Sequence, residues 1–88
     1  MRPNLRLLTR ILAGGADANI RFDDLRGLLK RLGFVERIRG SHHRFRYPGT
    51  AHMANLQRDG SDAKVYQVRQ VRRMLIQAGF AAITQGDH

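Results

Sequence analysis

The chain contains no cysteine, and its seven acidic residues are outnumbered by sixteen basic ones. Without cysteine it can form no disulfide framework, thiolate nucleophile or zinc–thiolate site, and its composition suits a reducing cytoplasm. The longest apolar runs are only a few residues, so no segment is expected to span a membrane. These absences argue against disulfide-stabilised secreted proteins, thiol enzymes and integral membrane proteins.

What the chain has in abundance is arginine. The formal net charge is +9, and all but two of the basic residues are arginines. A guanidinium group binds phosphate through two parallel hydrogen bonds and can stack on bases. The surplus favours a polyanion or an acidic protein as partner, although a merely basic, soluble surface fits the charge as well. With 88 residues we expect one domain with one modest core.

The N-terminal stretch predicts a helix over residues 5–13, capped by Asn4 and stopped by Gly14 and Gly15. Its leucines recur at helical spacing and need cover, so we expect this helix to pack on the core. An arginine-rich, acid-free, amphipathic N-terminus also describes a mitochondrial transit peptide, but the core-packing helix is the simpler interpretation. A polar linker is expected over residues 16–21.

Two further helices are expected. One begins at Asp23 or Asp24, because side-chain oxygens and negative charge suit the free N–H groups of a helix start. It ends at Gly33, with Phe34 folding back on the last turn as in a Schellman motif. The last helix covers residues 66–78 and is followed by the same Gly–Phe pair.

Between these helices the apolar period changes to that of strands. Strands are expected over residues 34–39, 42–47 and 52–58, the first two joined by a tight Gly40–Ser41 turn. The order α-β-β-β-α, preceded by an extra helix, predicts an α+β fold. Both core helices should cover one face of a three-stranded antiparallel sheet, because such a sheet must bury one face. The other face is then available for function.

The alternation of side chains divides the second strand between these two faces. The outward set is His42, Arg44 and Arg46, and the inward set is His43, Phe45 and Tyr47. A histidine beside phosphate-binding groups is what RNA cleavage requires, because histidine can exchange protons near neutral pH and arginine can stabilise phosphate charge. On the residues alone, a solvated histidine remains the simpler interpretation. The inward histidine is expected to be a half-buried packing residue.

A metal site is not expected. Neighbouring strand residues point to opposite faces, so His42 and His43 cannot easily share an ion. Asp59 and Asp62 lack the full ligand set of a calcium loop, and no phosphate-cradling glycine motif or nucleophile elbow is present. His52 could approach the hairpin from the third strand, but nothing in the sequence requires it to do so. We therefore expect neither a metal nor a cofactor.

The last helix carries a second basic group. Arg69, Arg72 and Arg73 lie on one side of it, and Lys64 precedes its start. Such a face is often only solvated, but it could also follow an RNA backbone or contact an acidic protein.

Several stretches in this order together resemble the HicA toxin family. They are the helix ending "LLKRLGF", the turn and strand "GSHHRF", a lysine before the last helix, and that helix's end "AGF". Those proteins are small bacterial messenger-RNA interferases with a double-stranded-RNA-binding-domain-like fold. The resemblance covers about residues 22–80, leaving residues 1–21 as a helical extension with its linker and residues 81–88 as a loose tail.

The resemblance implies the toxin of a type II toxin–antitoxin system, acting in the bacterial cytoplasm as a metal-independent endoribonuclease. It makes His42 the catalytic acid or base and Gly40 and Ser41 the turn that presents it. The alternative is a non-catalytic RNA-binding module of the same fold. Expected partners are messenger RNA and a HicB-type antitoxin that covers the exposed strip of His42, Arg44 and Arg46. The expected RNA-binding residues are Arg39, Arg44, Arg46, Lys64, Arg69, Arg72 and Arg73.

Overall fold

The computed structural model describes residues 5–82. Its elements, in chain order, are α1 (Leu5–Ala13), the 3-10 helix η1 (Asp17–Asn19), α2 (Phe22–Arg31), β1 (Val35–Arg39), β2 (His42–Arg46), β3 (Met53–Gln57) and α3 (Val65–Gln77). This order confirms the expected α+β fold and is consistent with the double-stranded-RNA-binding-domain-like arrangement. The expected cap at Asn4 and residues 83–88 of the expected tail lie outside the described residues.

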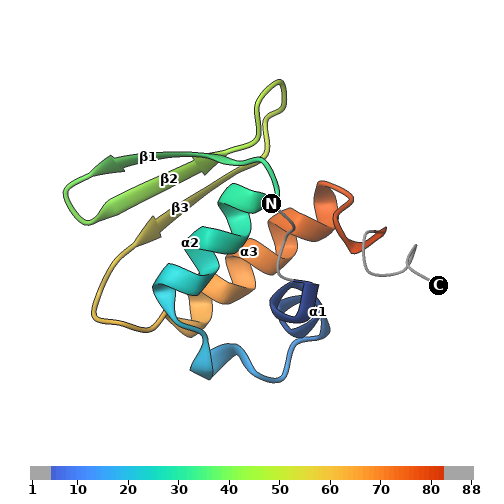
Figure 1. The fold of residues 1–88 in the computed structure, drawn as a ribbon, viewed down its shortest axis with the longest axis horizontal. Coiled ribbons are helices and arrows are strands. Elements are labelled where there is room, and N and C mark those ends of the chain that lie inside the picture. The colour runs from blue at the N-terminus through green and yellow to red at the C-terminus, as the bar shows by residue number, and fades with distance from the viewer. Residues whose placement is uncertain (1–4, 83–88) are drawn as a thin grey trace.

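The three strands form one antiparallel sheet in the order β1-β2-β3, with α2 and α3 side by side against one face (Figure 1). Alternate residues of β2 and β3 are buried against these helices, whereas β1 is an exposed edge strand. The helices contribute leucines and valines from their buried faces. The buried residues at the centre of this layer are Phe45, Ala54, Leu56, Leu25, Leu28, Leu29, Val68, Val71 and Leu75.

The N-terminal helix α1 is part of the same core. It lies against α3 on the side away from the sheet, where Figure 1 shows it end-on. Leu7, Leu8 and Ile11 are buried, which confirms that the extension packs on the core. Arg72 of α3 fastens it, because its Nε donates to the backbone oxygen of Ile11 at 2.7 Å and its guanidinium pairs with Asp17. Gly14 N–H donates to the same Ile11 oxygen at 3.2 Å, so the end of α1 is stabilised both by its own turn and by Arg72.

The stretch 16–21, expected to be a polar linker, is more ordered than that. It contains η1, and Ile20 is fully buried. The backbone oxygen of Ile20 accepts a hydrogen bond from Ala63 N–H at 2.7 Å, and Phe22 N–H donates to Ser61 O at 2.9 Å. A single isoleucine gave no periodic signal, and its burial depends on this pairing with a distant loop.

Helix α2 begins at Phe22, one or two residues before the expected start at Asp23 or Asp24. Arg21 is the N-cap residue, with an extended backbone and no side-chain capping bond. Both acids occupy the first turn, where their charge favours the helix dipole. Asp23 pairs with Arg58, and this hydrogen bond is the main reason why the pKa of its carboxyl lies below the ordinary value.

The expected Schellman end of α2 is confirmed. Phe34 N–H donates to Leu29 O at 3.0 Å and Gly33 N–H donates to Lys30 O at 3.1 Å. Gly33 has a φ of +108°, which side chains rarely adopt, and an added Cβ would lie 3.1 Å from the Tyr47 ring. The requirement for glycine at this helix end is therefore both conformational and steric.

The Gly–Phe pair after α3 makes the same two types of bond, with Phe80 N–H donating to Leu75 O at 2.9 Å. The two helix ends bring their phenylalanines together with Tyr47. The ring centroids of Phe34 lie 5.1 Å from Tyr47 and 5.7 Å from Phe80. This aromatic cluster of Phe34, Tyr47 and Phe80 closes one end of the core.

Candidate active site

His42 is the first residue of β2, directly after the Gly40–Ser41 turn. Gly40 has a φ of +59° and Ser41 has a negative φ, which is the pattern of a two-residue type II′ hairpin turn. The backbone oxygen of Ser41 accepts a hydrogen bond of 2.9 Å from Arg58 N–H, beyond the end of β3. The turn is thus held from the far edge of the sheet, and His42 leaves it in a fixed strand position.

The next residue, His43, faces the helices. It is 5% exposed, and is therefore more deeply buried than the half-buried position expected from sequence. Its Nδ1 lies 2.8 Å from Oε2 of Glu36, and its ring meets the Phe22 ring edge-on with centroids 5.1 Å apart. Because successive strand side chains point to opposite faces, this anchoring directs His42 to the free side of the sheet.

Glu36 is the centre of the polar contacts under the sheet. Arg26 binds it with both ends of its guanidinium fork, Nε to Oε2 at 2.6 Å and a terminal nitrogen to Oε1 at 2.9 Å. The Lys30 ammonium lies 3.7 Å from Oε1. The hydrogen bond from Arg26, followed by that from His43, lowers the pKa of Glu36 to about 2 against the opposing effect of burial. The carboxylate therefore stays charged at neutral pH and holds His43 in place.

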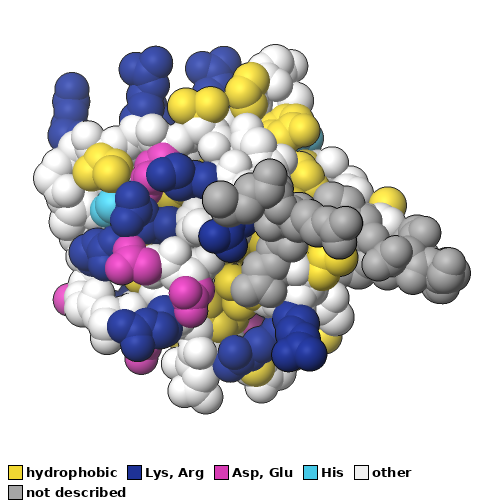
Figure 2. Space-filling view, in the orientation of Figure 1, with side chains coloured by type: hydrophobic (Ala, Val, Ile, Leu, Met, Phe, Trp, Pro, Cys, Tyr) yellow, Lys and Arg dark blue, Asp and Glu magenta, His cyan; other side chains and the backbone are white. Residues whose placement is uncertain are grey.

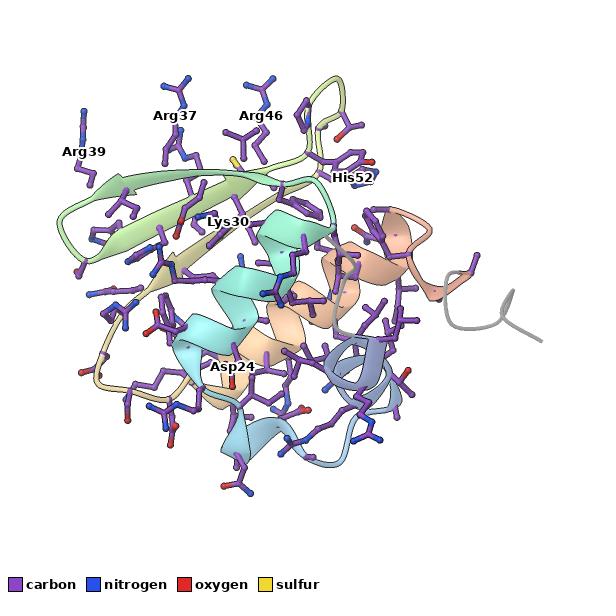
Figure 3. The ribbon with its side chains drawn as sticks, viewed as in Figure 1. Asp24, Lys30, Arg37, Arg39, Arg46 and His52 are labelled. Atoms are coloured by element: carbon purple, nitrogen blue, oxygen red, sulfur yellow. The ribbon has the colours of Figure 1, made fainter. Side chains whose placement is uncertain are left out.

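The free face of the sheet carries three residues from each strand. Figure 3 shows Arg37, Arg39 and Arg46 extending from it in a row, away from the helices. The strand pairing places Arg39 opposite His42 and Arg37 opposite Arg44. None of the strand residues on this face is acidic. They are Val35, Arg37, Arg39, His42, Arg44, Arg46, Met53, Asn55 and Gln57.

The basic residues elsewhere mostly have acidic partners. Ion pairs join Asp17, Asp23, Glu36 and Asp59 to basic side chains on the helices and in the loop after β3. By contrast, within residues 5–82 no ion pair includes any arginine of the free face. Figure 2 shows basic side chains projecting at the upper margin, over the sheet, and the acidic ones lower on the molecule. The free face thus carries positive charge that no acidic side chain of the described residues neutralises.

Arg37 and Arg44 concentrate this charge. They are direct cross-strand partners on the same face, an arrangement in which like charges destabilise a sheet. A bound polyanion would relieve that repulsion. Sequence reasoning did not single out Arg37, although strand alternation from Arg39 was a signal that could have found it.

Two adjoining hollows run along the free face and share Arg37 and Arg44. The first is lined by Arg37, Ile38, Arg39, His42, Arg44 and Asn55. The second continues past Val35, Arg46 and Met53 to the loop of residues 48–51. Arg44 is oriented between them, because its Nε donates to Oδ1 of Asn55 at 3.2 Å. We call the two hollows together the arginine groove.

The other basic residues expected to bind RNA do not line the arginine groove. Lys64 is the N-cap residue of α3 and its ammonium lies 3.0 Å from Asp59, whose hydrogen bond raises the lysine pKa. Arg72 is half-buried against α1, and Arg69 lies 3.8 Å from Asp17. Arg73 is exposed beside a separate small hollow that includes His52.

His52 is not brought to His42. Its backbone oxygen accepts a bond from Tyr47 N–H at 3.1 Å, just past the end of β2, whereas His42 pairs with Gln57 at the opposite end of β3. Figure 3 shows His52 beside the loop at one end of the sheet. A two-histidine site is thus not formed by these residues.

The described residues also lack other kinds of site. In residues 5–82 no three His, Asp or Glu side chains gather in a way that could hold a metal ion. The same part of the chain contains no helix with the length and apolar character needed to cross a bilayer.

Comparison with known proteins gives one family. A family model described as the HicA toxin of bacterial toxin–antitoxin matches residues 22–80, which run from the first residue of α2 through the phenylalanine after α3. No curated protein and no solved structure matches the chain. The match includes the whole sheet and both helices that cover it, and leaves out α1 and η1.

Proposed function

The chain belongs to the HicA toxin family of bacterial toxin–antitoxin systems, and on that premise we propose that it is an endoribonuclease that cleaves messenger RNA without metal. One observation carries the proposal. His42 is exposed at one end of an acid-free groove, opposite Arg39 and two residues from Arg44. A group able to exchange protons thus lies beside groups that bind phosphate, which is the combination that phosphodiester cleavage needs.

In the proposed reaction, the ribose 2′-oxygen attacks the adjacent phosphorus and the bond to the 5′-oxygen breaks. His42 accepts the proton of the 2′-hydroxyl or donates one to the departing 5′-oxygen. Arg39 and Arg44 bind the non-bridging oxygens and stabilise the charge that develops there. The products are a 2′,3′-cyclic phosphate and a 5′-hydroxyl, with no net change in protons.

His42 can perform only one of the two proton transfers at a time. The other residues lining its hollow are arginines, an isoleucine and an asparagine, none of which exchanges protons near neutral pH. We assign the second transfer to water. Gly40 and Ser41 contribute by fixing the turn, through the bond from Arg58 N–H to Ser41 O.

We propose Arg39, Arg44, Arg46 and the newly found Arg37 as the RNA-binding residues of this site. Lys64, Arg69 and Arg73 lie outside the arginine groove and would contact only a longer RNA. Arg72 is assigned a structural role, because its guanidinium is engaged by Asp17 and by the end of α1.

The second candidate is an RNA-binding module without catalysis. The observation that favours it is the row of arginines itself, which suits a phosphate backbone whether or not cleavage follows. Binding whose affinity falls steeply with salt, with the RNA left intact, would support this function over the first.

Family membership implies an antitoxin partner. We propose a protein of the HicB type that covers the arginine groove and so competes with RNA. The acid-free face supports this, because complementary charge speeds association and fixes the register of an interface.

The proposed function is tested with purified protein, single-stranded RNA and EDTA. Wild type should produce 2′,3′-cyclic phosphate ends, and His42→Ala should lower the rate by about 100-fold or more. His52→Ala is the matched control, because this histidine lies at the other end of the sheet, and it should keep wild-type activity. Undiminished cleavage by a folded His42→Ala protein would rule out the assignment.

A further inference from the structure

We propose that the arginine groove is one-sided. It binds roughly three nucleotides of extended single-stranded RNA, all on the same side of the bond that is cut. The inference rests on the proposed nuclease function and adds to it the direction and length of substrate binding. The inference follows from the position of His42 in the groove and from the two ends of the groove, the Gly40–Ser41 turn and the loop of residues 48–51.

His42 marks one end of the groove. It is the first residue of β2, and the chain before it is the two-residue Gly40–Ser41 turn. The nearer hollow includes His42 and Arg39 but nothing from the turn. A substrate whose scissile phosphate lies at His42 therefore has protein beneath it in one direction only.

The loop of residues 48–51 marks the other end. Pro48, Gly49, Thr50 and Ala51 line the second hollow together with Arg46. Figure 1 shows this loop, between β2 and β3, rising above the plane of the sheet. From His42 to Arg46 the strand covers about 14 Å, so the groove has a bounded length.

Positive charge is spaced along that length in three steps. Arg39 stands beside His42, Arg37 and Arg44 form the middle step, and Arg46 forms the last. Alternate residues on one face of a strand lie about 7 Å apart, comparable to the separation of successive phosphates in an extended strand. Each step can thus hold one phosphate, the first of them being the phosphate that is cut.

The middle step should bind a phosphate most strongly. It has two guanidinium groups, and Asn55 holds one of them by the 3.2 Å bond to Arg44 Nε. The last step differs, because Val35 and Met53 flank Arg46 and are 51% and 43% exposed. These apolar side chains offer a surface for the flat face of a base beside the third phosphate.

The test uses cleavable RNA oligonucleotides shortened from one end at a time around a mapped cleavage position. Removing nucleotides from one side, until fewer than two remain, should raise KM about 10-fold, which is the usual worth of one charged hydrogen bond. Shortening the other side to a single nucleotide should leave KM within about 2-fold. On the full-length oligonucleotide Arg46→Ala should raise KM by a similar factor, and on the sensitive shortened one it should have no further effect.

Two further measurements test the same proposal. Arg39→Ala should impair cleavage of every oligonucleotide, because Arg39 stands beside the cut phosphate. Binding of intact RNA to the His42→Ala protein should strengthen steeply with length up to roughly four nucleotides and only weakly beyond, where Lys64, Arg69 and Arg73 are the basic residues left to contact.

Each outcome bears on one of the two proposals. Equal loss of cleavage from shortening either side, or an Arg46→Ala effect that persists on the shortened RNA, would overturn the one-sided groove while leaving the nuclease intact. Length-limited binding without any cleavage would keep the groove and overturn the nuclease. Absence of oligonucleotide binding, with capture of an acidic protein instead, would overturn the groove as an RNA site.

Discussion

Nδ1 of His43 lies 2.8 Å from Oε2 of Glu36, on the side of the sheet opposite to that which His42 faces. Two histidines adjacent in the chain thus have different environments, one enclosed by the core and one open to solvent. The division separates the stability of the fold from the chemistry of the proposed site.

Replacing the two histidines should therefore have opposite effects. His43→Ala removes a buried ring and a partner of Glu36, and should lower the free energy of unfolding by about 3 kcal/mol. His42→Ala should change it by less than ~0.5 kcal/mol, because its side chain is exposed. Urea denaturation followed by circular dichroism measures both, and similar losses in the two variants would contradict the assignment of faces.

Acid should weaken the fold through Glu36. Its pKa in the folded protein is about 2, below the ordinary 4.5, so its ionised form adds stability that is fully present above about pH 4.5. That stability, on the order of 3 kcal/mol, should be lost as the pH falls from 4.5 through 2. Thermal denaturation at several pH values tests this.

The matched variants for the acid experiment are Glu36→Gln and Asp24→Asn. Glu36→Gln should be less stable at pH 7 and should lose less on acidification. Asp24 is exposed and points away from the sheet, so its variant should follow the wild-type curve (Figure 3). If Glu36→Gln showed the wild-type acid dependence, another carboxylate would have to be responsible.

Removing Arg37 should reduce the dependence of RNA binding on salt. Each phosphate contact to a single strand contributes about 0.7 to the slope of log affinity against log salt, so Arg37→Ala should lower the slope by that amount. The measurement uses the His42→Ala background to keep the RNA intact. Arg6→Ala, on the exposed side of α1, is the control and should leave the slope unchanged.

Charge reversal at Arg44 and Arg46 should weaken both RNA cleavage and antitoxin binding, because we propose that both ligands use the arginine groove. Cleavage rate and antitoxin affinity are measured on the same Arg44→Glu, Arg46→Glu protein. A loss of about 100-fold or more is expected for each, since both changes oppose a negatively charged ligand. Lost cleavage with unchanged antitoxin affinity would mean that inhibition acts from another face.

The contacts that Arg72 makes between α3 and the N-terminal extension should contribute measurably to the free energy of unfolding. Arg72→Ala removes the hydrogen bond to Ile11 O and the ion pair with Asp17, and should cost about 2 kcal/mol. Arg73→Ala, its exposed neighbour, should cost less than ~0.5 kcal/mol. Equal effects in urea denaturation would show that the extension is not held by Arg72.

The parts of the fold that the sequence predicted are those governed by local rules. The Gly–Phe pairs after α2 and α3 form Schellman ends because a positive φ at the glycine and a following apolar residue suffice to define them. The outward direction of His42 was predictable for a similar reason, since the pleat alone separates it from Phe45.

The parts that sequence did not reveal depend on contacts between distant segments. Glu36 reads as an ordinary exposed strand residue in "VERIR", and its burial depends on Arg26 approaching from α2. Arg37 became a candidate only when the register placed it opposite Arg44. Ile20, alone among polar neighbours, is buried because its backbone pairs with Ala63.

The aromatic cluster of Phe34, Tyr47 and Phe80 gives the protein an optical signature of its own. The chain has no tryptophan and only two tyrosines, of which Tyr66 is 61% exposed. The near-ultraviolet dichroism of tyrosine should therefore come mainly from Tyr47, whose ring is packed between two others. Because these rings join the ends of α2, β2 and α3, loss of that band registers the separation of three elements without any added label.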